Sequence, residues 1–181
     1  MNCWKIINLD KKFGMNRLHS QSLLIGLLTF IFLYIPLSVK HGTANLNESG
    51  IIPFILAILF LPAMHTFVHM LPLMILNKRT RLIYKRNMIF FPVTNYYTKK
   101  YLTKKASLLA TAAPTLLITI PGILGSWLFS TYYVYFLIFT AAHIALSFKD
   151  ILYMAYISKS PKHAYIENSS DEIVILVNRN D

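Results

Sequence analysis

The sequence predicts an all-α membrane protein with four transmembrane helices. Of its 181 residues, 55% are hydrophobic and only 14% are charged, whereas soluble domains carry about 25% charged residues. The mean hydropathy is +0.50, and the apolar residues are concentrated in four long runs. Basic residues lie between these runs, which is the arrangement that sets the orientation of a membrane protein.

Four apolar runs are expected to form the helices, at about 20–39, 51–76, 107–129 and 132–157. A helix needs roughly 20 residues to cross the hydrocarbon core. We interpret the first run as a retained helix, because it is longer than the apolar part of a signal peptide and "VKHGTANL" offers no small-residue cleavage site. Pro114, Pro121 and Gly122 interrupt the third run, so we expect a broken helix there.

Lysine and arginine residues are distributed unequally between the connecting segments. The N-terminal segment has four, the segment 77–105 nine and the tail 158–181 three, against one in the loop 40–50 and none near residue 130. Cytoplasmic segments carry this excess. We therefore expect a single membrane domain, residues 1–181, in the cell membrane, with several passes and with both termini, the basic segment and the tail in the cytoplasm.

Two stretches outside the runs have the composition of strands. "TRLIYKRNMIFFPV" (80–93) has β-branched and aromatic residues around "YKRN", which predicts a small strand–turn–strand insertion after the second helix. "AYIENSSDEIVILVN" (164–178) alternates similarly around "NSSD" and predicts a C-terminal β-hairpin. No internal repeat is visible in the sequence.

The net charge of +11 raises the question of a nucleic-acid partner. The sequence has no zinc finger, Gly-rich phosphate loop or RNA-binding motif. The basic residues are explained by topology and by contact with anionic headgroups. We therefore expect the lipid bilayer as partner and no nucleic acid. The single cysteine, Cys3, excludes an intrachain disulfide.

The second run contains the stretch "LPAMHTFVHMLPL" (61–73). His65 and His69 are four residues apart and so share one face of a helix. The spacing is that of the zinc peptidase motif H-E-x-x-H, but Thr66 occupies the position of the glutamate. Ionisable residues inside a membrane are costly and tend to mark function. A histidine pair at this spacing is also found in structural roles, hydrogen-bonded to backbone or hydroxyl groups.

The fourth run carries His143, Ser147 and Asp150 at i, i+4 and i+7, along one stripe of a helix. In the expected topology His69 and Asp150 each lie seven residues, about 10 Å, from the cytoplasmic end of their helices. We therefore predict a metal site of His65, His69 and Asp150, a ligand set that suits zinc, with His143 and Ser147 behind the ligands. Alternatively, a hydrogen bond from Asp150 to His143 or Ser147 would explain the stripe without metal.

The order of these features resembles a known family. A segment with "INLDKKFG", a helix with the H-x-x-x-H pair, a basic insertion, "KKASLLATAAPTLLIT" and "HIALSFKDILYMAYISKSP" follow one another. This order is similar to that of small four-helix bacterial membrane proteins classed as zincin peptidases, which are distantly similar to site-2 proteases. The resemblance covers nearly the whole chain, and the third helix matches only loosely. It implies that His65 and His69 are histidine ligands of zinc and that Asp150 is the carboxylate ligand.

Thr66 departs from the pattern of that family. In zincins the glutamate takes a proton from the metal-bound water, and a threonine hydroxyl is not basic near neutral pH. Asp150 is the only acidic residue between Glu48 and Glu167. If Asp150 binds the metal, no carboxylate in the membrane is left as general base. If Asp150 is the base, only His65 and His69 hold the metal, unless His143 serves as the third ligand.

Two functions therefore remain open from the sequence. The first is a zinc-dependent intramembrane metallopeptidase-like protein that is catalytically impaired because Thr66 occupies the general-base position, and no catalytic residue is assigned. The second is a non-catalytic membrane-embedded binding or regulatory protein, a pseudopeptidase or immunity-type protein, with a membrane protein or peptide as partner. A small transporter ranks lower, because only one helix is interrupted and no inverted repeat is visible.

Overall fold

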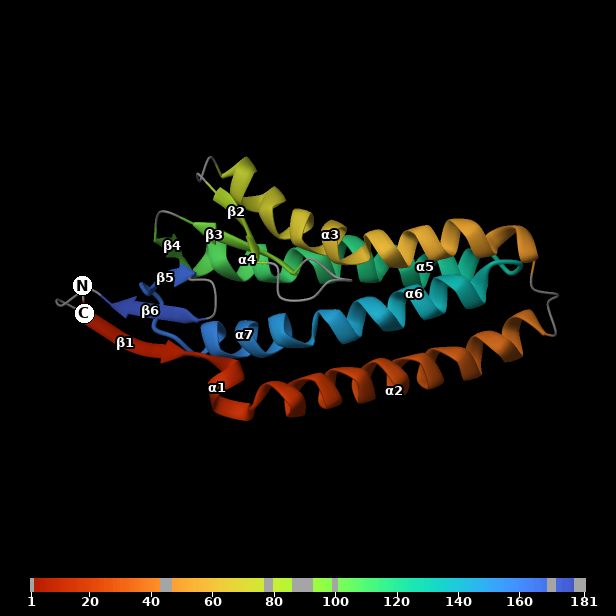
Figure 1. Cartoon of the computed structure of the whole chain (residues 1–181), viewed down its shortest axis with the longest axis horizontal. Helices are drawn as coiled ribbons and strands as arrows, with labels where there is room; N and C mark the ends of the chain where they lie inside the picture. Colours follow the sequence, from red (N-terminus) through yellow and green to blue (C-terminus); the bar gives the residue numbers. More distant parts are fainter. Residues whose placement is uncertain are drawn as a thin grey trace.

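The computed structural model describes residues 2–42, 47–76, 80–85, 93–98, 101–168 and 172–177, the strands at 80–85 and 93–98 by their backbone alone. The helices are α1 (Leu9–Phe13), α2 (Met15–His41), η1 (Glu48–Gly50), α3 (Ile51–Ile75), α4 (Lys104–Pro114), η2 (Thr115–Thr119), α5 (Ile120–Leu128), α6 (Tyr133–Leu146) and α7 (Phe148–Ser158). The strands are β1 (Asn2–Ile7), β2 (Thr80–Lys85), β3 (Val93–Thr98), β4 (Leu102–Thr103), β5 (Tyr165–Asn168) and β6 (Ile173–Val177). The long helices form a bundle, and the strands gather at one of its ends (Figure 1).

Three helical stretches are long and apolar enough to cross a membrane, namely Met15–His41, Glu48–Ile75 and Lys104–Leu128. A fourth is obtained among the described residues if α6 and α7, which are bent by 48° at a short break, count as one span. Helices thus occupy all four predicted positions. The prediction of one uninterrupted helix at about 132–157 is wrong, because the chain bends at Ser147.

The N-terminal segment enters the bundle through a glycine turn. The side chain of Asn8 accepts a hydrogen bond from the Lys11 amide at 2.9 Å and caps α1. Gly14, with φ of 81°, joins α1 to α2 in a backbone conformation that favours glycine. Further along α2, a Cβ atom at Gly26 would lie 2.8 Å from the Cβ atom of Ala145. The lack of a side chain at Gly26 therefore lets α2 pack closely on α6.

The third run passes through its prolines without the break that we predicted. Pro114 ends α4, and the π-helical turn η2 carries the chain on into α5. Pro121 lies in the first turn of α5, where a missing N–H is tolerated. π-Helical turns occur frequently at functional sites. This one places the buried side chain of Thr119 inside the bundle.

The bend between α6 and α7 changes the predicted stripe of polar residues. The Ser147 amide donates to the His143 carbonyl at 2.9 Å, so the backbone stays hydrogen-bonded across the bend. Ser22 of α2 donates its hydroxyl to the carbonyl oxygen of Ala145 beside it. Asp150 consequently lies in the first turn of a new helix. The helix dipole favours a negative charge at that position.

The C-terminal hairpin is confirmed and belongs to a larger sheet. Strands β5 and β6 pair antiparallel, with Tyr165 opposite Leu176. The four-stranded sheet has the order β1-β6-β5-β4. Strand β1 pairs with β6, with Asn2 opposite Val177, and the short β4 pairs with β5. Neither β1 nor β4 was predicted, because each is completed only by a partner far away in the sequence.

The insertion after α3 is present as a second, two-stranded sheet of β2 and β3. The position of its predicted turn is wrong in the first half of "YKRN", since Tyr84 and Lys85 pair with Thr94 and Val93 inside the ladder. The rest of the predicted turn, at 86–87, lies outside the described residues. Contacts with α3 place this small sheet beside the end of that helix.

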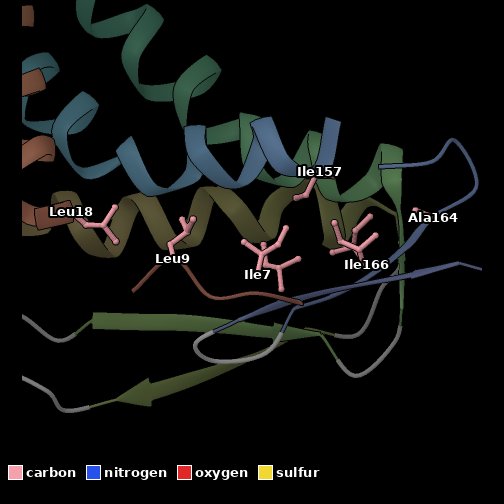
Figure 2. Packing of buried hydrophobic residues seen from close by; sticks show 8 residues of the cluster. Ile7, Leu9, Leu18, Ile157, Ala164 and Ile166 are labelled. Atoms are coloured by element: carbon pink, nitrogen blue, oxygen red, sulfur yellow. The ribbon is translucent and has the colours of Figure 1, made fainter. Parts of the chain in front are cut away.

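The largest buried apolar cluster joins the four-stranded sheet to the helices (Figure 2). Its members come from β1, α1, α2, α7, the loop after α7, β5 and β6: Ile7, Leu9, Leu18, Ile157, Ala164, Ile166, Ile173 and Ile175. Burying one such leucine or isoleucine contributes about 1.5–3 kcal/mol. The cluster therefore fixes the sheet and the N-terminal segment to one end of the bundle.

Candidate metal centre

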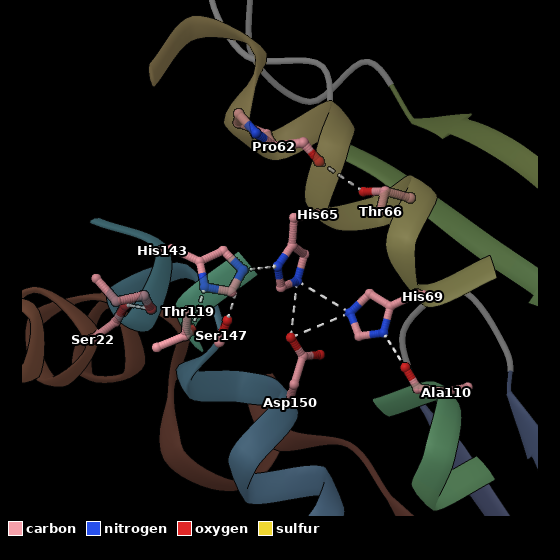
Figure 3. Close-up of polar contacts among 11 residues, drawn as sticks. Ser22, Pro62, His65, Thr66, His69, Ala110, Thr119, His143, Ser147 and Asp150 are labelled. Atoms are coloured by element: carbon pink, nitrogen blue, oxygen red, sulfur yellow. Dashed lines mark hydrogen bonds and ion pairs between the residues drawn. The ribbon is translucent and has the colours of Figure 1, made fainter. Parts of the chain in front are cut away.

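Three side chains from α3 and α7 meet inside the bundle (Figure 3). The Nε2 atoms of His65 and His69 lie 2.9 Å and 3.4 Å from Oδ2 of Asp150. The two Nε2 atoms are 3.1 Å apart. The side chain of Asp150 keeps 22% of its surface exposed, whereas both histidines are buried. In the described part of the chain, these three residues are the one group of His, Cys, Asp or Glu side chains arranged to hold a metal ion.

The spacing of the three donor atoms fits a zinc ion. Zinc takes nitrogen and oxygen ligands at about 2.0–2.2 Å in tetrahedral geometry, which puts the ligand atoms roughly 3.3 Å from one another. The three separations here, 2.9, 3.1 and 3.4 Å, lie close to that value. Two imidazoles and one carboxylate form a ligand set that zinc accepts while keeping one position open. The donor set and its geometry therefore suit the metal.

His69 is held in the orientation and tautomer that a ligand needs. Its Nδ1 lies 2.8 Å from the carbonyl oxygen of Ala110 on α4. A carbonyl only accepts, so Nδ1 carries the proton and donates it. The lone pair of Nε2 then faces Asp150 and His65. A hydrogen bond of this kind behind a metal ligand is a common feature of metal sites.

His143 lies behind His65 and does not face the donor atoms. Its Nε2 is 3.1 Å from Nδ1 of His65, and its Nδ1 is 2.8 Å from Oγ1 of Thr119. The Ser147 hydroxyl is 3.5 Å from Nε2 of His143. His143, fully buried, thus contacts the ring nitrogen of His65 opposite to the one near Asp150. The arrangement in which His143 is the third ligand does not match this geometry.

The carboxylate of Asp150 contacts His65 and His69. The described structure records no hydrogen bond from it to His143 or Ser147. The alternative in which Asp150 hydrogen-bonds to His143 or Ser147 of its own stripe is therefore not what the structure shows. Asp150 and His143 instead contact the histidines of α3.

Sequence reasoning missed two groups that support the histidines, Thr119 and the carbonyl oxygen of Ala110. Backbone carbonyls leave no signal in a sequence. The interruption of the third run by Pro114 and Pro121 was the one available indication of the π-helical turn that carries Thr119. A threonine in an apolar run is otherwise an ordinary residue.

Thr66, at the position of the missing glutamate, bonds within its own helix. Its hydroxyl donates to the carbonyl oxygen of Pro62 at 3.0 Å. In Figure 3 the hydroxyl points back along α3, and the Asp150 carboxylate lies on another side of the helix. Of the described glutamates, Glu48 lies in η1, at the start of the helical stretch Glu48–Ile75 and at the opposite end of the bundle from the sheet, and Glu167 and Glu172 lie in or beside the sheet.

A family model described as "Putative zincin peptidase" matches residues 58–165. The chain belongs to this family. The matched region of the zincin family begins before His65, includes the insertion and the π-helical turn, and ends in β5 beyond Asp150. The family suggests zinc as the metal and a metallopeptidase-like function. Neither the comparison with curated proteins nor the comparison with solved structures finds a match.

Proposed function

We propose that the protein is a membrane-embedded zinc protein with a peptidase-like site whose hydrolytic activity is impaired. The convergence of Nε2 of His65, Nε2 of His69 and Oδ2 of Asp150 supports this proposal most strongly. These three atoms would hold the zinc, and the fourth position would face a water molecule or a peptide carbonyl. His143 and Ser147 stand behind the ligands.

The exposed surface of the bundle supports a placement in the membrane. Large apolar side chains are exposed along the helices, among them Leu23 at 72%, Phe32 at 78%, Ile52 at 72% and Leu128 at 70%. Lipid contact accounts for this exposure better than water does. We propose four spans in one domain of the cell membrane, with α6 and α7 together forming the fourth. The basic end that carries the sheet is then cytoplasmic, and so are both termini.

The residues around the proposed metal have distinct tasks. A bound zinc ion supplies a Lewis acid that polarises a carbonyl group and lowers the pKa of bound water. The carbonyl oxygen of Ala110 orients His69, and His143 orients His65 while Thr119 orients His143. Supporting bonds of this kind typically account for about 10- to 100-fold in metal affinity or activity.

Impairment follows from the absence of a general base. General acid–base catalysis contributes typically 100- to 10,000-fold. The hydroxyl of Thr66 donates to Pro62 and has no appreciable basicity. Asp150 is engaged with both histidines, so its carboxylate is not available for a second task. The protein is therefore expected to bind zinc and to hydrolyse peptides slowly.

A second candidate function is favoured by the hydrogen bond from Thr66 to Pro62. This bond gives the threonine a structural task within α3 in place of a catalytic one. The protein would then be a pseudopeptidase that keeps the zinc site to stabilise its helices. It would bind a membrane protein or a peptide in a regulatory or immunity-type role.

Zinc content tests the proposal directly. The detergent-purified protein is compared with His65→Ala and Asp150→Ala, and with His19→Ala as a control that removes an exposed histidine of α2. We expect about one zinc per chain in the original protein and in the control, and less than about a tenth of that in the other two. Metal-free original protein would refute the zinc site, as would equal loss from His19→Ala.

A further inference from the structure

Positive charge is concentrated at the end of the bundle that carries the four-stranded sheet. The described residues there include Lys5, Lys11, Lys12, Arg17, Lys104, Lys105, Lys159 and Lys162. At the opposite end, the charged side chains of the described residues are those of Lys40 and Glu48. The end with the four-stranded sheet is therefore the basic end, and it lies at one surface of the proposed membrane-spanning region.

One cavity at this end is lined mainly by basic groups. Its volume is about 640 Å³, and the described residues of its lining include Lys104, Lys105, Lys162, His163 and Tyr165 and no carboxylate. A site for a small molecule typically measures about 300–1,000 Å³. The cavity thus has the size of a ligand site and a charge that attracts an anion.

The lysines of this cavity differ in what they contact. Lys104 donates its ammonium group to the carbonyl oxygens of Ser158 and Ser160, which fixes its position at the end of α7. Lys105 and Lys162 are exposed. Within the described part of the chain, neither makes a side-chain hydrogen bond or an ion pair, whereas Lys149 does pair with Asp10 at 2.7 Å. Two uncompensated ammonium groups therefore face one cavity.

We propose that this cavity binds the phosphate of an anionic membrane lipid. Lys104 begins the apolar stretch Lys104–Leu128, so the cavity lies at the edge of a proposed span, at the level of lipid phosphates. Leu109, one turn further into α4, is 49% exposed and offers an apolar surface for an acyl chain. Basic pockets at the cytoplasmic ends of transmembrane helices are suited to anionic headgroups. The inference rests on the proposed placement in the membrane and does not require zinc.

A second basic hollow supports the choice of the first. It measures about 410 Å³ and is lined by Lys5, Lys11 and Lys12, but also by the carboxylate of Glu172. Lys12 there contacts the hydroxyl group of Tyr156 at 2.5 Å. Part of the positive charge of this hollow is thus compensated inside the protein. The cavity with Lys105 and Lys162 is therefore the one to which we assign the lipid.

Binding of phosphatidylglycerol to the detergent-purified protein tests the proposal, with phosphatidylcholine as the neutral comparison. The test variant is Lys105→Gln with Lys162→Gln. Arg17→Gln with Lys159→Gln is the control, because it removes the same charge from two exposed residues outside the cavity. One basic residue near an anionic membrane surface contributes roughly a factor of five, so we expect the test variant to bind phosphatidylglycerol about 25-fold more weakly. The control should change binding less than about threefold, within the spread expected for screened surface charges.

Each outcome decides the proposal. Restored binding in Lys105→Arg with Lys162→Arg supports it, because that variant keeps both charges in place. Equal losses in the test and control variants would refute it in favour of unspecific charge attraction, and so would equal binding of the two lipids. Displacement of the lipid by inorganic phosphate would assign the cavity to a soluble anion instead. Repeating the measurement on Asp150→Ala separates this result from the zinc site, because lipid binding should persist there.

Discussion

His41, at the end of α2, and His69, inside the bundle, both contact a backbone carbonyl group but differ in what their rings do. His41 ends α2, and its Nε2 lies 3.1 Å from the carbonyl oxygen of Ser126. Beside it, the ammonium group of Lys40 lies 2.9 Å from the carbonyl oxygen of Trp127. Both carbonyl groups belong to the last turn of α5. Cationic and hydrogen-bonding side chains are favourable at the C-terminus of a helix, so His41 and Lys40 stabilise that helix end.

His69 uses a backbone carbonyl in a different way. Its bond to Ala110 leaves the other ring nitrogen directed at Asp150 and His65. A carbonyl contact is thus common to a structural histidine and to a candidate ligand. The distinguishing feature is a second nitrogen that meets other donor atoms. We conclude that convergence of donors, and not burial or spacing, separates the two kinds of site.

Supplying a general base beside the candidate metal centre is expected to produce the largest effect. Thr66→Glu should raise the hydrolysis of fluorescein-labelled casein by at least about 100-fold, the lower range for a general base. Thr66→Gln is the matched control, because it has a similar shape without a basic carboxylate, and it should stay at the original rate. Equal rates for the two variants would show that more than the glutamate is missing, and would favour the non-catalytic function.

Removing the support of His65 should give a smaller effect. His143→Leu deletes the contact with Nδ1 of His65 and should lower zinc affinity by about 10- to 100-fold, measured by competition with a chelating dye. His143→Gln, whose amide oxygen can accept from Nδ1, should recover part of the affinity. Unchanged affinity in His143→Leu would contradict a positioning role for this residue.

The smallest effect is expected at the opposite end. His41→Ala removes one hydrogen bond to Ser126 and should destabilise the protein by about 1 kcal/mol, measured by thermal unfolding in detergent. Zinc content should not change. Loss of zinc from His41→Ala would contradict a purely structural role for His41. It would show that the C-terminal end of α5 and the metal site depend on each other.

Much of the fold could be predicted from local patterns. The apolar runs gave the positions of the helices, and the alternation around "NSSD" gave β5 and β6. The spacing of His65 and His69 predicted their shared face, and depth in the membrane suggested that Asp150 lies at the same level. The structure brings these three side chains together, while zinc binding itself stays a prediction.

Other elements could not be predicted, because they depend on partners that are distant in the sequence. Strand β1 is a strand because β6 lies beside it. The contact between His143 and His65 joins residues 78 positions apart. Local propensity carries no information about such pairs. The bend at Ser147 likewise has no proline or glycine beside it that would have indicated it in the sequence.

The sequence by itself determined the apolar helices, the charge difference between the two ends, the face shared by the histidine pair and the absence of a glutamate beside it. These properties depend on composition and on helical spacing, which are local. Only the tertiary structure decided that Asp150 faces both histidines, that His143 contacts His65, and that the hydroxyl of Thr66 bonds to Pro62. Each of these contacts depends on the direction in which a side chain points. The packing between helices fixes that direction.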